Sequence, residues 1–198
     1  MSSGLSRTEA WSLLCDWVDS EPLRRHCLAV EASMRAYARR NGADEELWGV
    51  VGLLHDMDYE RHPDMDAADG HPRTAMRVLT ERDVDPAIVR AIASHADFME
   101  VSRDSDMEKT LYAVDELSGF VLACAYVRPQ GIHGLTPKSV KKKLKQPSFA
   151  AAVNREDVTR GAEQLGVDFD EHVTIVIAAL EEHADELGID GSPADDPA

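Results

Sequence analysis

The spacing of apolar side chains along the chain predicts helices almost throughout. In the segment 22–42, apolar residues recur at intervals of three or four from Leu23 to Tyr37, which is the pattern of one buried helix face. Pro22 suits the first turn of such a helix, and Gly42 suits its end. No stretch alternates convincingly between apolar and polar residues in the manner of a strand. We therefore expect an all-α fold.

The same reasoning divides the rest of the chain into helices and connecting loops. Helices are predicted at 8–19, 22–42, 44–56, from Pro72 onward, 85–95, 107–127, from Thr136 onward, 154–166 and 168–187. The segment 44–56 is apolar nearly all round, which is typical of a helix in the middle of a fold. These elements predict a compact bundle of roughly eight to ten helices. The bundle forms a single domain over 8–190, with a flexible N-terminus at 1–7 and a disordered acidic tail at 191–198.

Composition and charge narrow the class of protein. The 198 residues include no apolar run near the roughly 18 needed to cross a bilayer, and no signal-peptide core, so a cytoplasmic location is expected. The three cysteines show no paired spacing, which favours reduced core thiols over disulfides. A net charge of −16 disfavours binding to duplex nucleic acid. A small phosphorylated substrate remains compatible, because a bound cation can reverse the local field.

Polar side chains on apolar helix faces are the best indication of chemistry. His26 borders the buried face of its helix, and His55 and Asp56 end the most apolar helix. Asp115 lies four residues after Leu111 on the apolar face of the long helix 107–127. A buried carboxylate needs a cation or a donor, and imidazole with carboxylate suits a divalent metal. The alternative is that Asp115 caps a helix or pairs with an arginine while the histidines are ordinary core residues.

The order His, His-Asp, Asp resembles the signature of the HD superfamily of metal-dependent phosphohydrolases. The His-Asp pair ends the buried sequence Val-Gly-Leu-Leu-His-Asp (51–56), and the last Asp lies in Ala-Val-Asp-Glu-Leu (113–117). The resemblance covers roughly residues 23–127. It implies an HD-domain bundle in which the metal is held by His26, His55, Asp56 and Asp115, with helices at 136–188 completing the domain.

Two more histidines resemble an extended form of this signature that binds a second metal. His71 begins a helix in Gly-His-Pro, and His95 ends one. The resemblance implies that both hold the second ion and that Asp56 bridges the two ions. The cofactor is then one or two divalent ions among Mn, Mg, Co, Ni, Zn and Fe. The alternatives are a simple N-cap for His71 and a histidine favoured by the helix dipole for His95.

The sequence departs from the family pattern just after the His-Asp pair. Many members carry a lysine three residues beyond the Asp, and Tyr59 stands there in this chain. We expect Asp56 and Asp58 to be the catalytic carboxylates, with Asp58 orienting the attacking water. Arg61 and His62 are the candidates for contacting a substrate phosphate. The alternative is that most of this loop is a solvated acidic segment.

Lysine is distributed very unevenly. The chain has six lysines, and five of them lie between 138 and 145. We expect Lys138, Lys141 and Lys142 to contact an anionic substrate if their helix folds over the metal site, or else an acidic patch on a partner subunit. The alternative is a solvated amphipathic helix.

These features predict a hydrolase that attacks a small phosphorylated metabolite or nucleotide with metal-activated water. One alternative is a di-iron oxygenase on the same scaffold, since the six ligands would serve that chemistry equally well. A second is a non-enzymatic ligand-binding or signalling module, which the retention of every ligand argues against. Monomer and homo-oligomer both remain open.

Overall fold

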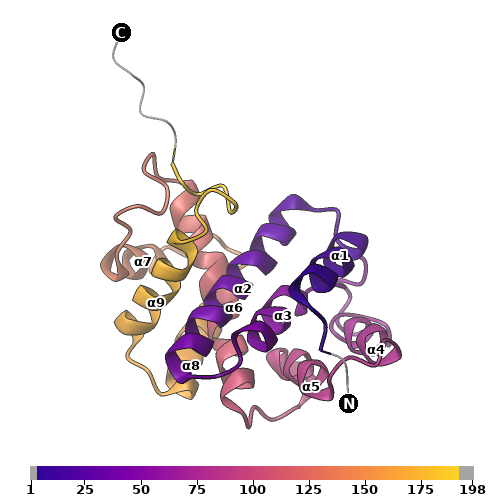
Figure 1. Ribbon diagram of the computed structural model, residues 1–198. Coiled ribbons are helices and arrows are strands. Elements are labelled where there is room, and N and C mark those ends of the chain that lie inside the picture. The colour runs from indigo at the N-terminus through magenta and orange to yellow at the C-terminus, as the bar shows by residue number, and fades with distance from the viewer. Residues whose placement is uncertain (1–3, 192–198) are drawn as a thin grey trace.

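The computed structural model describes residues 4–191, and every regular element in that range is helical (Figure 1). The predicted all-α fold is therefore confirmed. The elements are α1 (Arg7–Trp17), α2 (Glu21–Asn41), α3 (Glu45–Leu54), α4 (Arg73–Glu81), α5 (Pro86–His95), a short 3₁₀ helix η1 (Asp97–Met99), α6 (Asp106–Tyr126), α7 (Pro137–Leu144), α8 (Arg155–Leu165) and α9 (Phe169–Glu181).

Most helix ends follow the predicted signals. Pro22 lies in the first turn of α2, and Gly42 ends that helix with a φ of 64° in the left-handed region. Ser6 forms a capping box at the start of α1, and Arg7 is the first residue of that helix. Residues 6 and 7 therefore belong to the ordered start of α1 and not to the predicted flexible N-terminus at 1–7. Residues 1–3 and the predicted tail from 192 onward lie outside the described range.

The prediction that the last helix reaches 187 is wrong. The helix α9 ends at Glu181, and residues 182–188 form turns. Gly188 has a φ of 67°, and the turn segment packs Ala184 and Leu187 into the core. The apolar spacing of the predicted helix was thus real, although the backbone that presents it is a series of turns.

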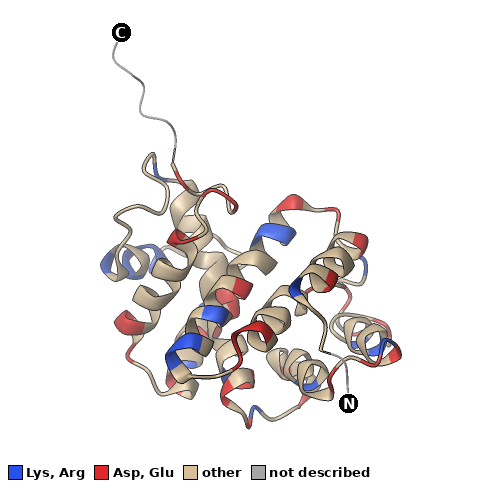
Figure 2. Ribbon diagram, in the orientation of Figure 1, with Lys and Arg blue, Asp and Glu red and all other residues tan. Residues whose placement is uncertain are grey.

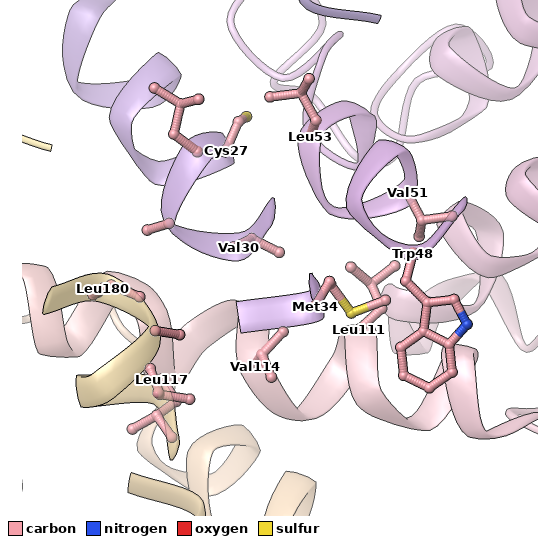
Figure 3. Packing of buried hydrophobic residues seen from close by; sticks show 14 of the residues in the cluster. Cys27, Val30, Met34, Trp48, Val51, Leu53, Leu111, Val114, Leu117 and Leu180 are labelled. Carbon is pink, nitrogen blue, oxygen red and sulfur yellow. The ribbon is translucent and has the colours of Figure 1, made fainter. Parts of the chain in front are cut away.

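The hydrophobic core lies where α2, α3 and α6 meet (Figure 3). Its side chains include Cys27, Val30 and Met34 from α2, Trp48, Val51 and Leu53 from α3, and Leu111, Val114 and Leu117 from α6. The backbones of α2 and α3 come very close at Gly52, where an added Cβ would lie 2.9 Å from the Val30 carbonyl oxygen. The end of α3 is therefore held tightly against the first half of α2.

The long helix α6 contacts α2, α5, α8 and α9, so it links the two sides of the bundle (Figure 1). The helix α8 approaches it closely at Gly161, where an added Cβ would lie 2.6 Å from the Cα of Ala113. This arrangement brings α2, α6 and the C-terminal ends of α3 and α5 together around one region. All three cysteines are unpaired thiols, as expected.

Across residues 4–191, the helices are too short or too polar to cross a membrane.

Candidate metal centre

Six side chains predicted as ligands meet in one place, although they come from five separate segments. His26 belongs to α2, His55 and Asp56 follow α3, and Asp115 belongs to α6. His71 precedes α4, and His95 is the last residue of α5. Their ligand atoms form two groups of three, which we name the first cluster (His26, His55, Asp115) and the second cluster (Asp56, His71, His95).

The first cluster is tight. The Nε2 atoms of His26 and His55 lie 3.2 Å apart, and the Oδ1 atom of Asp115 lies 3.1 Å from the first and 3.3 Å from the second. All three ligand atoms therefore face one point. Two neutral rings cannot satisfy each other through facing Nε2 lone pairs, so this geometry requires a proton or a cation between them.

The second cluster has similar spacing. The Nε2 atoms of His71 and His95 lie 3.2 Å apart, and Oδ1 of Asp56 lies 3.4 Å and 3.7 Å from them. Oδ2 of the same carboxylate lies 3.7 Å from Nε2 of His26, which belongs to the first cluster. The Asp56 carboxylate therefore faces both clusters, in the position that a bridging ligand would take.

The opposite ring nitrogens of three histidines are anchored to the protein. Nδ1 of His55 donates to the Gly52 carbonyl oxygen at 2.8 Å, and Nδ1 of His95 donates to the Ile92 carbonyl oxygen at 2.5 Å. A carbonyl oxygen only accepts, so the proton must lie on Nδ1 and leaves Nε2 available as a ligand. Anchoring of this kind is usual for metal-binding histidines.

Asp58 provides the third anchor, and its predicted role is corrected. Its Oδ1 accepts from Nδ1 of His71 at 2.7 Å, while its Oδ2 accepts from the backbone N–H of Ala75 at 2.7 Å. The side chain is fully buried and does not line the pocket. Asp58 therefore orients His71 rather than an attacking water.

The two ligand carboxylates are held in the ionised state. Burial opposes ionisation of Asp115, but the charge of His55 and hydrogen bonds from His26 and His55 keep the pKa of that carboxyl well below its usual value. Burial likewise opposes ionisation of Asp56, and His55 and His95 lower its pKa despite this. Burial also disfavours a charged His55, yet the two carboxylates raise its pKa to about 9. This is an environment that attracts cations, so the donor set fits a metal.

The clusters open into a pocket of about 560 Å³. Its wall includes Tyr59, which stands in place of the family lysine, and residues that the sequence did not single out, namely Met65, Asp97, Phe98, Tyr112, Glu116, Asn154, Asp157 and Arg160. Tyr59, Met65 and Phe98 are large apolar side chains with 39%, 39% and 41% exposure, so the mouth has an apolar side. Burial, together with the charge of Asp115, raises the pKa of the Glu116 carboxyl to about 7.

Among residues 4–191, Arg160 is the only lysine or arginine that lines this pocket. Its Nε donates to the hydroxyl of Tyr112 at 2.6 Å, and its Nη2 pairs with Asp97 and Asp157. The Tyr112 hydroxyl in turn donates to Asp157 at 2.7 Å. No local pattern in α8 marks Arg160 as special, because its position at the pocket depends on the packing of α8 against α6.

The predicted substrate contacts of Arg61 and His62 are not supported, because neither lines the pocket. Nη2 of Arg61 donates to the Asp16 carbonyl oxygen at 2.6 Å, and its guanidinium lies over the Trp17 ring. His62 lies 3.4 Å from Asp69 and beside the same Trp17 ring. Both side chains therefore tie the loop after α3 to the end of α1.

The lysine-rich helix α7 also lies away from the pocket, so Lys138, Lys141 and Lys142 do not line it. Figure 2 shows these basic residues on α7, beside α9 and on the far side of α6 from α4 and α5. Nζ of Lys141 pairs with Asp170 on α9 at 2.7 Å. These lysines were expected to contact substrate only if their helix folded over the metal site, and it does not do so.

An all-helical fold with six convergent histidine and aspartate side chains defines a candidate metalloprotein. Residues 23–119 match the model of the HD domain family, so this part of the chain is an HD domain. The match starts where the predicted resemblance starts and contains all six ligands. Comparisons with curated proteins and with solved structures found no match.

Proposed function

We propose that this protein is a metal-dependent phosphohydrolase that acts on a small phosphorylated metabolite or nucleotide. The observation that carries the proposal is the presence of two three-residue clusters of candidate ligands, with Asp56 facing both, along one pocket. Each cluster has few protein ligands, which leaves room for water and substrate. A pocket of about 560 Å³ is within the usual range for small-molecule sites.

The first cluster would hold one ion and the second cluster another, with Asp56 between them. Divalent ions bound there would supply a water of lowered pKa as the nucleophile and positive charge for the phosphoryl oxygens. The residues of the chain fix the geometry. The anchored rings of His55, His71 and His95 cannot turn away, so little reorganisation is needed when substrate binds.

Arg160 is the residue we propose to contact the substrate phosphate, in place of Arg61, His62 and the lysines of α7. Its guanidinium is held at the pocket wall by Tyr112, Asp97 and Asp157, so it is oriented before substrate arrives. A planar guanidinium suits bidentate binding of phosphate oxygens. Asp97 and Asp157 also neutralise much of the positive charge of Arg160. Binding of a phosphate beside Arg160 therefore depends on additional positive charge from the metal ions.

The test combines metal analysis with a search for phosphate release. Protein purified without chelator is assayed for metal per chain, and phosphate release is followed by ³¹P NMR over a panel of nucleotides and sugar phosphates. The isosteric variant Asp115→Asn removes one ligand charge, and Asp185→Asn is the matched control because Asp185 is exposed and lies outside the pocket.

For the wild type and for Asp185→Asn we expect up to two ions per chain and metal-dependent phosphate release. Asp115→Asn should lose metal and should also lose activity. Arg160→Gln should retain its metal and lose activity through a raised KM. A chain that binds no metal, or that releases phosphate equally well in Asp115→Asn, contradicts the proposal.

One alternative draws on the same ligands. Four imidazoles and two carboxylates also suit iron, so the site would serve a di-iron oxygenase. Iron as the main ion after aerobic purification, a visible absorption band and oxygen uptake without phosphate release would favour that function. A protein that binds no metal and whose stability is unchanged by chelator would instead favour a non-enzymatic module.

A further inference from the structure

A second, smaller cavity lies between the C-terminal part of α6 and the lysine-rich helix α7. Its volume is about 240 Å³. It is lined by Cys124, Arg128, Leu135, Ser139, Lys142, Lys143 and Gln146. It shares no lining residue with the metal pocket, and no aspartate or glutamate in the described part of the chain lines it. Three cations therefore surround a cavity in a protein whose net charge is −16.

The cations at this cavity lack anionic partners. Within residues 4–191, Lys142 and Lys143 form no ion pair, whereas Lys141 on the same helix pairs with Asp170. Nη2 of Arg128 donates to the His133 carbonyl oxygen at 2.9 Å, which fixes the guanidinium. Its Nη1 is buried and has no hydrogen-bond partner among the described residues. A buried donor without a partner is uncommon, and an oxyanion bound in this cavity would satisfy it.

The remaining lining groups add no negative charge. Burial raises the pKa of the Cys124 thiol to about 11, despite the opposing charges of Lys143 and Arg128, so the thiol stays neutral. Ser139 and Gln146 offer a hydroxyl and an amide, which can both donate to an oxyanion. The cavity thus combines fixed positive charge with neutral hydrogen-bond donors.

We propose that this cavity is a binding site for a small oxyanion of the phosphate class. Arginine and lysine around a compact pocket form charge-assisted hydrogen bonds to phosphate oxygens. The volume of 240 Å³ is below the ~300 Å³ at which drug-sized ligand sites begin, so it suits inorganic phosphate or the head of a small phosphomonoester. Figure 2 shows the basic colouring of α7 beside the acidic residues on the elements around it.

The site is tested by titrating the full chain with inorganic phosphate while backbone amides are followed by ¹H–¹⁵N NMR at constant ionic strength. Lys142→Gln removes one cation of the cavity. Lys138→Gln is the matched control, because it makes the same charge change on the same helix at a residue that does not line the cavity. Phosphate binding at the metal centre is recognised separately, by shifts at residues of that pocket.

We expect saturable shifts at Ser139, Lys142 and Gln146. Lys142→Gln should weaken this binding by at least about tenfold, as for the loss of one charge-assisted hydrogen bond, and Lys138→Gln should leave it nearly unchanged. Tighter binding of glycerol phosphate than of inorganic phosphate would identify a monoester as the ligand, and the reverse order would identify the free ion. Shifts that never saturate, or equal weakening by both variants, would overturn the proposal.

Discussion

Each histidine of the second cluster is held by a contact on the side of the ring away from the ligand atoms. For His71 that contact is Asp58, which accepts one hydrogen bond from the ring and another from the Ala75 backbone. An asparagine side chain at this position would have only one oxygen to accept with. Asp58→Asn should therefore loosen His71 and weaken metal binding at the second cluster by about 10–100-fold, with the first cluster retained.

A metal titration followed by calorimetry would measure this change at both clusters. Asp66→Asn is the control, because Asp66 is exposed in the same loop and its side chain contacts neither ligand cluster. Equal metal affinity in Asp58→Asn and the wild type would show that His71 needs no such anchor.

His172 has a role in the core rather than at the metal centre. Its Nε2 donates to the Ala113 carbonyl oxygen at 3.0 Å, so its Nδ1 accepts from the hydroxyl of Tyr37 at 2.6 Å. Burial lowers the pKa of His172 below its usual value. The unfolded chain takes up a proton near pH 6.5 whereas the folded chain resists it, so this residue makes the protein less stable as pH falls below about 6.5.

The free energy of unfolding in urea, measured between pH 7.5 and 5.5, tests this linkage. His172→Gln should be less stable than the wild type at pH 7.5. Its free energy of unfolding should also fall less steeply as the pH is lowered, by up to about 1.4 kcal/mol per pH unit. His183→Gln, at an exposed position, should keep the wild-type slope. A His172→Gln slope equal to that of the wild type would disprove the assignment.

At the residue scale, the sequence predicted the side chains that converge at the two clusters better than the basic side chains that line the pocket. His26, His55 and Asp115 could be found because a polar group on an apolar helix face is unusual in itself. Arg61 and Arg160 look alike in the sequence, since each is an ordinary arginine near acidic residues. Only tertiary packing places Arg160 at the pocket and Arg61 against Trp17.

The contact between α6 and α8 positions one wall of the pocket, because Arg160 is followed at once by the packing residue Gly161. A Cβ at 161 would lie 2.6 Å from the Cα of Ala113, which is backbone and cannot move alone. Gly161→Ala should therefore push α8 away from α6 and cost about 1–3 kcal/mol of stability. Thermal unfolding measures the cost, and Glu163→Ala, at an exposed position of the same helix, is the control.

At the element scale, helices with clear end signals were predicted to within a few residues. Pro22 and Gly42 bound α2 as expected, since both act through backbone chemistry that needs no tertiary context. The last helix was predicted six residues too long. Its end at Glu181 has no glycine or proline, and the turns beyond still bury Leu187, so apolar spacing alone could not locate it.

The whole molecule is organised so that the candidate metal centre joins most of its parts. The six candidate ligands come from α2, the end of α3, the loop before α4, the end of α5 and α6. Bringing Asp56 and Asp115 together places two half-buried, ionised carboxylates in one region. Their mutual repulsion opposes folding unless positive charge lies between them. Metal ions at the two clusters would supply that charge and would bind only the folded chain.

Metal should therefore stabilise the entire fold rather than the pocket alone. An ion present at a hundredfold excess over its Kd adds about 2.7 kcal/mol to the free energy of unfolding, because the unfolded chain scatters the five ligand segments. We expect one cooperative thermal transition that moves to higher Tm when Mn²⁺ or Zn²⁺ is added and returns when chelator is added. Asp115→Asn removes one ligand charge and, with it, the contacts of the Asp115 carboxylate with His26 and His55. Because these contacts hold the pKa of Asp115 below its usual value, the variant should be less stable than the wild type in chelator, and it should also gain much less Tm on addition of metal. An equal gain in both proteins would mean that the ions bind elsewhere on this acidic chain, and that the convergence of the six ligands does not depend on metal.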